Sequence, residues 1–375
     1  MQVIRRGFLT GATLLLLCLG AGVIYEHWSR WNIAGNYPPP GDLVEFAGAR
    51  SHLHCIGNGS PIVVLEAGLD INGSFSWRRV QPDVAVTTRV CAYDRAGILW
   101  SEPRQGPRDA RRIADELHAL LAAATEPSPY VMVGHSFGGL LARVYAHRFK
   151  GEVVGLVLVD SAHPLQNWRV ARVRVASREP PPSPVLMKLR PVVAKFLSRT
   201  GVTRLTTGRP EDPPVAYART SLSAMHAEGQ AFVESCAEAA HTGKLGDLPL
   251  VVLTAGQRFR MPGLSGEAQN AFHDTRFVLQ AELAKLSENS EQRVSPRAGH
   301  YIQLDDPDAV VSAIVDVVTA ARQGTRLRKP VLALNAEAGL APAHRPRRVL
   351  APRPSSQEPH QEPVNVAVAR PPEAP

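Results

Sequence analysis

The sequence predicts an α/β fold with a mainly parallel β-sheet covered by helices on both faces. Apolar runs such as Ile62–Glu66 and Val153–Val159 are typical of strands that are buried on two sides. Stretches with apolar residues at helical spacing, such as 109–124 and 308–321, alternate with these runs. In a third feature, YVMVGHSFGG at 130–139, a strand leads through a glycine-rich turn into a helix. This alternation indicates a parallel sheet.

Residues 1–30 have the features of a signal-anchor segment. Arg5 and Arg6 precede an apolar stretch at 7–25, which is at the short end of the roughly 17–25 residues that span a membrane. Because cytoplasmic flanks carry an excess of basic residues, we expect the N-terminus to lie in the cytoplasm and the rest of the chain outside it. The alternative is a secreted protein whose signal peptide is cleaved, with Gly20-Ala21-Gly22 as the nearest candidate site.

A proline-rich linker is expected at 31–41, followed by a core made of 42–160 and 248–322. The proline run at 38–40 stiffens the linker. Besides the runs already named, strand patterns occur at 43–46, 51–56, 86–93, 248–254 and 292–295. The helix at 109–124 begins at a good N-cap, Asp109, and the helix at 308–321 follows Pro307.

The segment 161–247 lacks the alternation of strands and helices and is too long for a loop, so it predicts an inserted cap. Its stretch 185–199 reads as an amphipathic helix. Three interpretations of such a helix remain open. It forms a lid over a substrate pocket, lies on an anionic membrane surface, or is an ordinary helix with a solvated face. The tail at 323–375 contains ten prolines and is expected to be disordered.

Charge and cysteine content exclude some functions. The net charge is +8, but the tail holds eight basic against four acidic residues and 1–30 adds another net +2. About +2 remains for 31–322, so the charge gives no reason to expect nucleic acid as a partner. Cys18 lies in the N-terminal apolar stretch. The other cysteines, Cys55, Cys91 and Cys236, allow one disulfide and require none, and no zinc-ligand spacing occurs.

Ser136 is the predicted nucleophile. It lies on the sharp turn between the strand at 130–133 and the helix that follows, where Gly134 and Gly138 remove side chains that would clash. This turn exposes the serine Oγ at a helix N-terminus, where main-chain N–H groups stabilise an oxyanion. The predicted donors are the N–H of Phe137 and the N–H of Leu69, in the loop after the strand Ile62–Glu66.

An activated serine needs a base, and the base needs an orienting acid. His300 is the best base, because it follows the last predicted strand and therefore lies at the same sheet edge as Ser136. His135 adjoins the serine and is expected to point away from it. Asp160, at the end of Val153–Val159, is the favoured acid, while Glu267 and Asp274 remain competitors.

Together these motifs resemble the α/β-hydrolase superfamily, and most of all bacterial membrane-tethered or exported hydrolases. The resemblance covers about 37–322 and is carried by YPPPG (37–41), GSPIVVLEAGLD (59–70), RVCAYDRAG (89–97), YVMVGHSFGGLLARVYA (130–146), GLVLVDSAHP (155–164), DLPLVVLTAG (247–256) and AGHYIQLDDPDAV (298–310). It implies an eight-stranded sheet with a helical cap after the sixth strand.

By the same resemblance Ser136 is the nucleophile and His300 the base, and Asp160 occupies the position after strand six that haloalkane dehalogenases use for their acid. Those dehalogenases have an aspartate nucleophile, so the serine argues against their chemistry and against epoxide hydrolysis. The chain departs from the family pattern D-R-x-G-x-G-x-S at Leu99, where DRAGILWS (94–101) lacks the second glycine.

The expected activity is hydrolysis of a carboxylic ester or thioester through an acyl-enzyme, with a small acyl compound as substrate. The alternatives are a serine peptidase of the proline-iminopeptidase type and a non-catalytic ligand-binding member of the fold. A peptidase of that type needs an acidic cap, and the basic segment 161–199 speaks against it. Neither a metal nor an organic cofactor is expected, and the membrane is an expected partner through the N-terminal segment.

Overall fold

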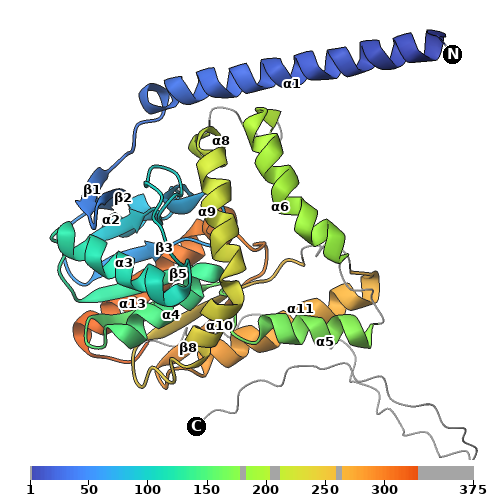
Figure 1. The fold of residues 1–375 in the computed structure, drawn as a ribbon. Coiled ribbons are helices and arrows are strands. Elements are labelled where there is room, and N and C mark those ends of the chain that lie inside the picture. Colours follow the sequence, from blue (N-terminus) through green and yellow to red (C-terminus); the bar gives the residue numbers. More distant parts are fainter. Residues whose placement is uncertain (1, 178–182, 203–211, 259–263, 328–375) are drawn as a thin grey trace, which may run out of the picture. The chain divides into compact units, whose positions relative to one another are not determined.

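The computed structural model describes residues 2–177, 183–202, 212–258 and 264–327. The predicted tail therefore lies almost entirely outside the described residues. The described residues contain an eight-stranded sheet in the order β1-β2-β4-β3-β5-β6-β7-β8 (Figure 1). The predicted α/β-hydrolase fold is confirmed. The strands are β1 Asp42–Phe46, β2 Ala49–Ile56, β3 Ile62–Glu66, β4 Val90–Tyr93, β5 Tyr130–His135, β6 Val153–Val159, β7 Leu250–Ala255 and β8 Ser290–Ser295.

The first two strands are antiparallel to their neighbours, and the remaining pairs are parallel. Strands β3, β5, β6 and β7 are mainly apolar and almost entirely buried because helices cover both of their faces. The predicted strand at 86–93 is shorter than expected. Val86 caps the end of α2 (Gln81–Ala85) and its side chain is 88% exposed, so only Val90–Tyr93 joins the sheet.

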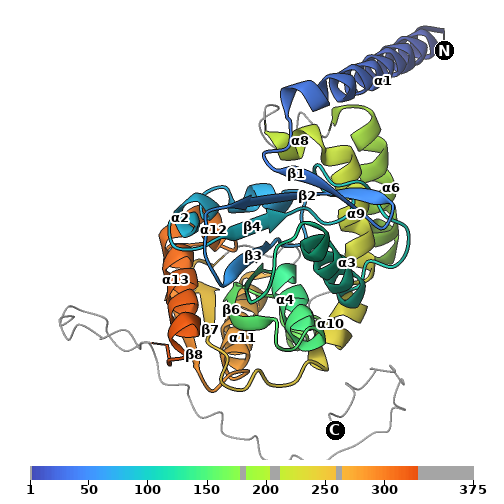
Figure 2. The same cartoon turned by 90° about the vertical axis from the view of Figure 1, so that its left-hand side faces the viewer.

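Helices form a layer on each face of the sheet, which Figure 2 shows edge-on. One layer contains α3 (Ala110–Ala123), α4 (Phe137–Arg148), α10 (Phe232–Ala240) and α11 (Gly266–Ala284). The other contains α2 and α13 (Pro307–Gln323) together with the short elements η1 (Gly73–Trp77) and α12 (Ile302–Asp305). Alternate residues of each strand face the two layers, as the period of a β-strand requires.

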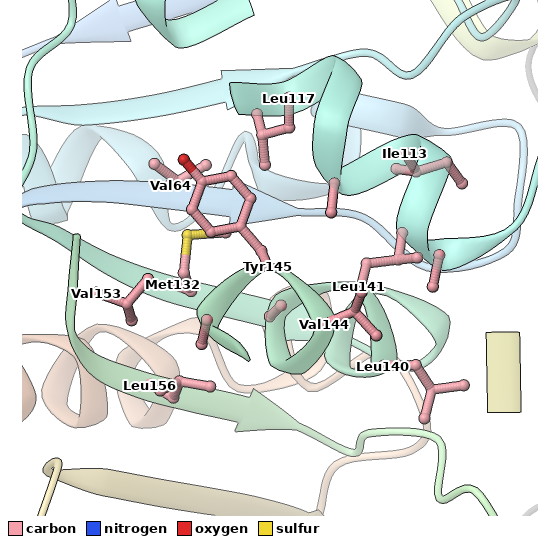
Figure 3. Close-up of a cluster of buried hydrophobic side chains, with 14 of the residues drawn as sticks. Val64, Ile113, Leu117, Met132, Leu140, Leu141, Val144, Tyr145, Val153 and Leu156 are labelled. Atoms are coloured by element: carbon pink, nitrogen blue, oxygen red, sulfur yellow. The ribbon is translucent and has the colours of Figure 1, made fainter. Parts of the chain in front are cut away.

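The core on the α3–α4 side holds the helix that follows Ser136 in place. Tyr145 and Leu141 of α4 are fully buried against strands β3, β5 and β6 and against α3 (Figure 3). Their neighbours there are Val64, Ile113, Leu117, Met132, Leu140, Val144, Val153 and Leu156. This close packing fixes the N-terminus of α4 relative to the ends of the strands.

Between β6 and β7 the elements that the structure describes are helices joined by turns and loops. The helices are α5 (Gln166–Ala176), α6 (Pro184–Arg199), α8 (Pro213–Ala216), α9 (Ala218–Gln230) and α10. The amphipathic pattern at 185–199 thus forms a helix, α6. Its apolar side chains are exposed: Val185, Leu189, Val192, Val193, Phe196 and Leu197. The N-terminal segment forms one long helix, α1 (Gln2–Asn36), which extends into the residues expected as linker.

Two expectations about single residues have a clear outcome. Cys55 of β2 and Cys91 of β4 are cross-strand partners and form a disulfide, which the sequence allowed without requiring it. Cys236 is a buried free thiol.

Leu99, the departure from the family pattern, has φ 43°, a backbone conformation that glycine adopts far more readily. The loop keeps the glycine-like conformation although the residue is leucine.

Candidate active site

Ser136 lies on a strained turn between β5 and α4. Its backbone has φ 52° and ψ −118°, which costs a non-glycine residue about 1–3 kcal/mol and is found mostly at functional sites. A Cβ on Gly134 would collide with the carbonyl oxygen of Gly138, and a Cβ on Gly138 would collide with that of Glu66. Both glycines are therefore needed for the turn to close, as the sequence predicts.

His300 lies between Ser136 and Asp160 and contacts both. Its Nε2 is 3.0 Å from the Ser136 Oγ, and its Nδ1 is 2.6 Å from the Asp160 Oδ2. An ionised carboxylate only accepts hydrogen bonds, so Nδ1 carries the proton and Nε2 accepts from the serine hydroxyl. The three predicted residues come from the β5–α4 turn, the loop before α12 and the end of β6, and the structure brings them together at one edge of the sheet.

Asp160 is held in its ionised form. The carboxyl is almost fully buried, and its partners besides His300 are the guanidinium of Arg276 and, at 3.2 Å, the N–H of Ala255. Burial by itself raises the pKa of Asp160, but the hydrogen bond from His300 and the charge of Arg276 outweigh burial and lower it below its ordinary value. This carboxylate is therefore suited to orient an imidazole and to stabilise an imidazolium.

The competing acids lie away from His300. Glu267 and Asp274 are both on α11, where they are exposed. Asp274 is 74% exposed and lies 3.8 Å from the guanidinium of Arg258. Of the three acids left open by the sequence, Asp160 is the one that contacts the histidine.

The loop after β3 packs directly against the serine. A Cβ on Gly68 would lie 3.4 Å from the Cβ of Ser136 and 2.8 Å from the Nδ1 of His135. Within the described part of the chain, neither the N–H of Leu69 nor that of Phe137 donates to a protein acceptor. Both predicted donors are thus available beside the serine for a ligand oxygen.

His135, the neighbour of Ser136 in the sequence, packs against His300 and Tyr301. The centre of its ring lies 4.8 Å from that of His300 and 4.9 Å from that of Tyr301, with the ring planes tilted to one another, and its Nε2 donates to the carbonyl oxygen of His300 at 2.9 Å. Burial, followed by the neighbouring His300, lowers the pKa of His135 to about 4. His135 is therefore a neutral support for the loop that carries His300.

A cavity of about 650 Å³ opens above Ser136 and His300. Its walls come from α5 and α11, with Val170 and Phe272 among the apolar residues and Arg174 and Gln280 among the polar ones. Helix α6, for which a lid is one of the three interpretations, does not line this cavity among the described residues. Helix α5, which the sequence did not single out, takes that position.

The sequence alone does not reveal Arg276, which contacts Asp160 from α11. Nothing local marks this arginine, because the charge pattern of α11 is ordinary and the pairing with Asp160 spans 116 residues of sequence.

One group of side chains has the donor types of a metal site. Sulfur atoms of Cys55 and Cys91 and the carboxylate of Glu126 lie within 4.8 Å of one another. The two sulfurs are joined as a disulfide, and Arg89 donates to Glu126 at 2.6 Å. Since a metal needs deprotonated thiols, these residues do not fit one in this state.

Comparison with known proteins supports the fold and the broad class. The sequence model of the "Alpha/beta hydrolase family" matches residues 53–313. YqjL of Bacillus subtilis (strain 168), described as uncharacterized, is 28% identical over 272 residues, which is 72% of this chain and 88% of that protein. The 2-hydroxymuconate semialdehyde hydrolase of Pseudomonas sp. (strain CF600) is 36% identical over 135 residues, 35% of this chain and 47% of that enzyme.

Among solved structures, a loop variant of a haloalkane dehalogenase from Bradyrhizobium elkanii superposes with a TM-score of 0.51 at 18% identity. The match covers 75% of this chain and 96% of the dehalogenase, and it shows the shared fold alone. Together with the match of the family model to residues 53–313, these findings show that the chain belongs to the α/β hydrolase family.

Proposed function

We propose that the protein is a serine hydrolase that cleaves a carboxylic ester or thioester through an acyl-enzyme. The observation that carries the proposal is the unbroken line of hydrogen bonds from Ser136 Oγ through His300 to Asp160, at 3.0 and 2.6 Å. Such a line is the arrangement that activates a serine hydroxyl. Serine in the nucleophile position also argues against the chemistry of dehalogenases, which attack with a carboxylate.

The reaction has two steps. Ser136 Oγ attacks the carbonyl carbon while His300 Nε2 takes its proton, and the main-chain N–H groups of Phe137 and Leu69 bind the oxyanion. His300 then gives the proton to the leaving alcohol or thiol, which departs and leaves an acyl-serine. In the second step His300 takes a proton from water, the hydroxide displaces the acyl group, and the serine regains its proton. Asp160 remains ionised and stabilises the imidazolium in both steps.

An ester substrate is supported better than a peptide with a free amine. A peptidase of the proline-iminopeptidase type needs a carboxylate to bind that amine. Among the described residues that line the cavity, Asp160 is the one carboxylate, and His300 and Arg276 already hold it. The remaining wall combines apolar residues with neutral polar ones such as Gln280 and with the basic Arg174, which suits a neutral or electron-rich acyl compound.

The proposed organisation places this chemistry outside the cytoplasm. Residues Thr10–Ser29 have the length and apolar composition of a membrane span, and the Cys55–Cys91 disulfide is typical of oxidising compartments. Residues 42–160 and 248–322 form the catalytic core, and the helices of 161–247 form its cap. Removal of residues 1–36 should release the enzyme from membranes, and a truncated chain that stays membrane-bound would contradict the anchor.

A fluorophosphonate probe tests the proposed function directly. The probe should label the full-length wild-type protein and fail to label Ser136→Ala, and a series of p-nitrophenyl esters should then give the preferred acyl chain length. A folded wild-type protein that the probe does not label would favour a non-catalytic ligand-binding role on the same fold.

A further inference from the structure

Arg95, in the loop after β4, is a buried hub beside the oxyanion loop. Its side chain is 3% exposed. Nη1 donates to the carbonyl oxygen of Ala67 at 2.8 Å and to Glu66 Oε1 at 2.7 Å, and Nη2 donates to the carbonyl oxygen of Gly68 at 2.7 Å. A single guanidinium therefore holds two successive carbonyl groups of the loop that leads to Leu69.

Glu228 completes the binding of this guanidinium from the segment inserted between β6 and β7. It lies on α9 with no exposed side-chain surface, and its two oxygens accept from Arg95 Nε and Nη2, both at 2.8 Å. All five N–H bonds of the guanidinium now have an acceptor, and the bidentate pair with Glu228 fixes the plane of the fork. The pair joins the inserted segment to the core across 133 residues of sequence.

The contact with Gly68 determines where the N–H of Leu69 points. The carbonyl of Gly68 and the N–H of Leu69 belong to one planar trans peptide unit, so the two bonds point in opposite directions. When Arg95 holds the carbonyl on one side, the N–H is directed to the other side, where Gly68 packs against Ser136. A cationic donor on the carbonyl also polarises the peptide and makes its N–H a stronger donor.

We infer that Glu228 is a positioning residue for the oxyanion hole: through Arg95 it fixes the peptide between Gly68 and Leu69. The cap segment therefore contributes to transition-state stabilisation as well as to the substrate cavity. Arg95 also contacts Glu66. Loss of Glu228 therefore leaves the positive charge of Arg95 paired but allows its guanidinium group to rotate. This inference rests on the proposed function, because an oxyanion hole has a role only in acyl transfer.

Glu228→Gln tests the inference. It replaces one carboxylate oxygen, which accepts a hydrogen bond from Arg95, with an NH2 group, which cannot accept one. Removal of a whole oxyanion donor lowers kcat by about 10²–10³-fold, so a loosened donor should lower kcat for p-nitrophenyl acetate by about 10- to 100-fold. KM for this small ester should stay within about twofold, because the interaction strengthens only in the transition state. Affinity for phenylboronic acid, which forms a tetrahedral adduct on the serine, should fall in parallel with kcat.

Glu116→Gln is the matched control. Glu116 of α3 also binds two arginines, Arg108 Nη1 at 2.7 Å and Arg112 Nε at 2.9 Å, and it is largely buried but remote from the cavity lining. Glu116→Gln should lose about as much stability as Glu228→Gln and should keep the wild-type kcat. If Glu228→Gln does not fold, Glu228→Asp can be measured in its place. The aspartate keeps the charge but is too short to bind both Nε and Nη2 of Arg95, so it should show the same loss of kcat.

The inference is overturned if a folded Glu228 variant keeps the kcat and boronate affinity of Glu116→Gln, or if KM alone changes. A wild-type protein without esterase activity or probe labelling would instead refute the proposed function, so the two failures are distinguishable.

Discussion

Arg276 and His300 donate to the same oxygen of the Asp160 carboxylate, Oδ2. The carboxylate that is proposed to stabilise the histidine cation is thus shared with a permanent cation. Arg276 keeps Asp160 ionised in a buried position, and it also opposes the positive charge that His300 acquires during catalysis.

Arg276→Gln should therefore move the acid limb of the kcat/KM profile to higher pH. The charge of Arg276 is one of the causes that lower the pKa of Asp160, so without it the carboxylate that the mechanism needs takes up a proton at a higher pH. The measurement is kcat/KM for a p-nitrophenyl ester between pH 4 and 9. Arg169→Gln, which removes a cation paired with Glu282 at 2.9 Å, should leave the limb in place. A limb that stays fixed or moves to lower pH in Arg276→Gln would contradict this electrostatic account.

Asp160→Asn should lower kcat on the order of 10⁴-fold. The amide cannot stabilise an imidazolium and favours the wrong tautomer of His300, because its NH2 group donates where the carboxylate accepted. Asp274→Asn is the control from the same set of candidate acids, and its activity should match the wild type. If the kcat of Asp160→Asn stays near the wild-type value, Asp160 is not the acid of a catalytic triad.

Loss of the Cys55–Cys91 disulfide should lower the free energy of unfolding by about 2–4 kcal/mol. The bond links β2 to β4 and closes a chain segment with a sequence separation of 36 residues. Thermal melts with and without reductant measure the effect, and Cys55→Ser/Cys91→Ser should be insensitive to reductant. Identical melts of the oxidised wild type in both buffers would argue against the bond.

Stability should fall as the pH drops from about 6.5 towards 4. Burial lowers the pKa of both His135 and His163 to about 4, and for His163 the charges of Arg143 and Arg169 add to the effect of burial. In this window the unfolded chain binds protons that the folded chain does not, so each histidine destabilises the fold by roughly 2 kcal/mol at pH 5.

Urea denaturation at several pH values measures this dependence, and His163→Asn should make it shallower. An equal pH slope in the variant and the wild type would show that His163 is protonated to the same extent in both states.

The sequence predicted the parts of the fold and site that depend on local pattern. Strands β3 and β6 match their apolar runs to the residue, and the strained turn at Ser136 follows from the glycines on either side of it. The expected strand at 86–93 was too long, because alternating valines do not tell a strand from the end of a short helix.

Pairings between distant residues could not be predicted in this way. The position of Asp160 at the end of a strand favours it over Glu267 and Asp274 but leaves the choice open, and its contact with His300 appears only in the fold. Arg276 and Glu228 lie on helices with ordinary charge patterns, and their partners are 116 and 133 residues away. The amphipathic pattern of α6 defines an apolar face but not what that face contacts.

The measurement that tests the account most directly is ester turnover by Ser136→Ala. The variant should lose at least about 10⁴-fold in kcat for short p-nitrophenyl esters, while its circular dichroism and melting temperature remain those of a folded protein. Ser235→Ala, which removes the hydroxyl of a fully buried serine of α10, is the matched control and should retain wild-type rates. Wild-type rates in Ser136→Ala would contradict the proposed serine mechanism.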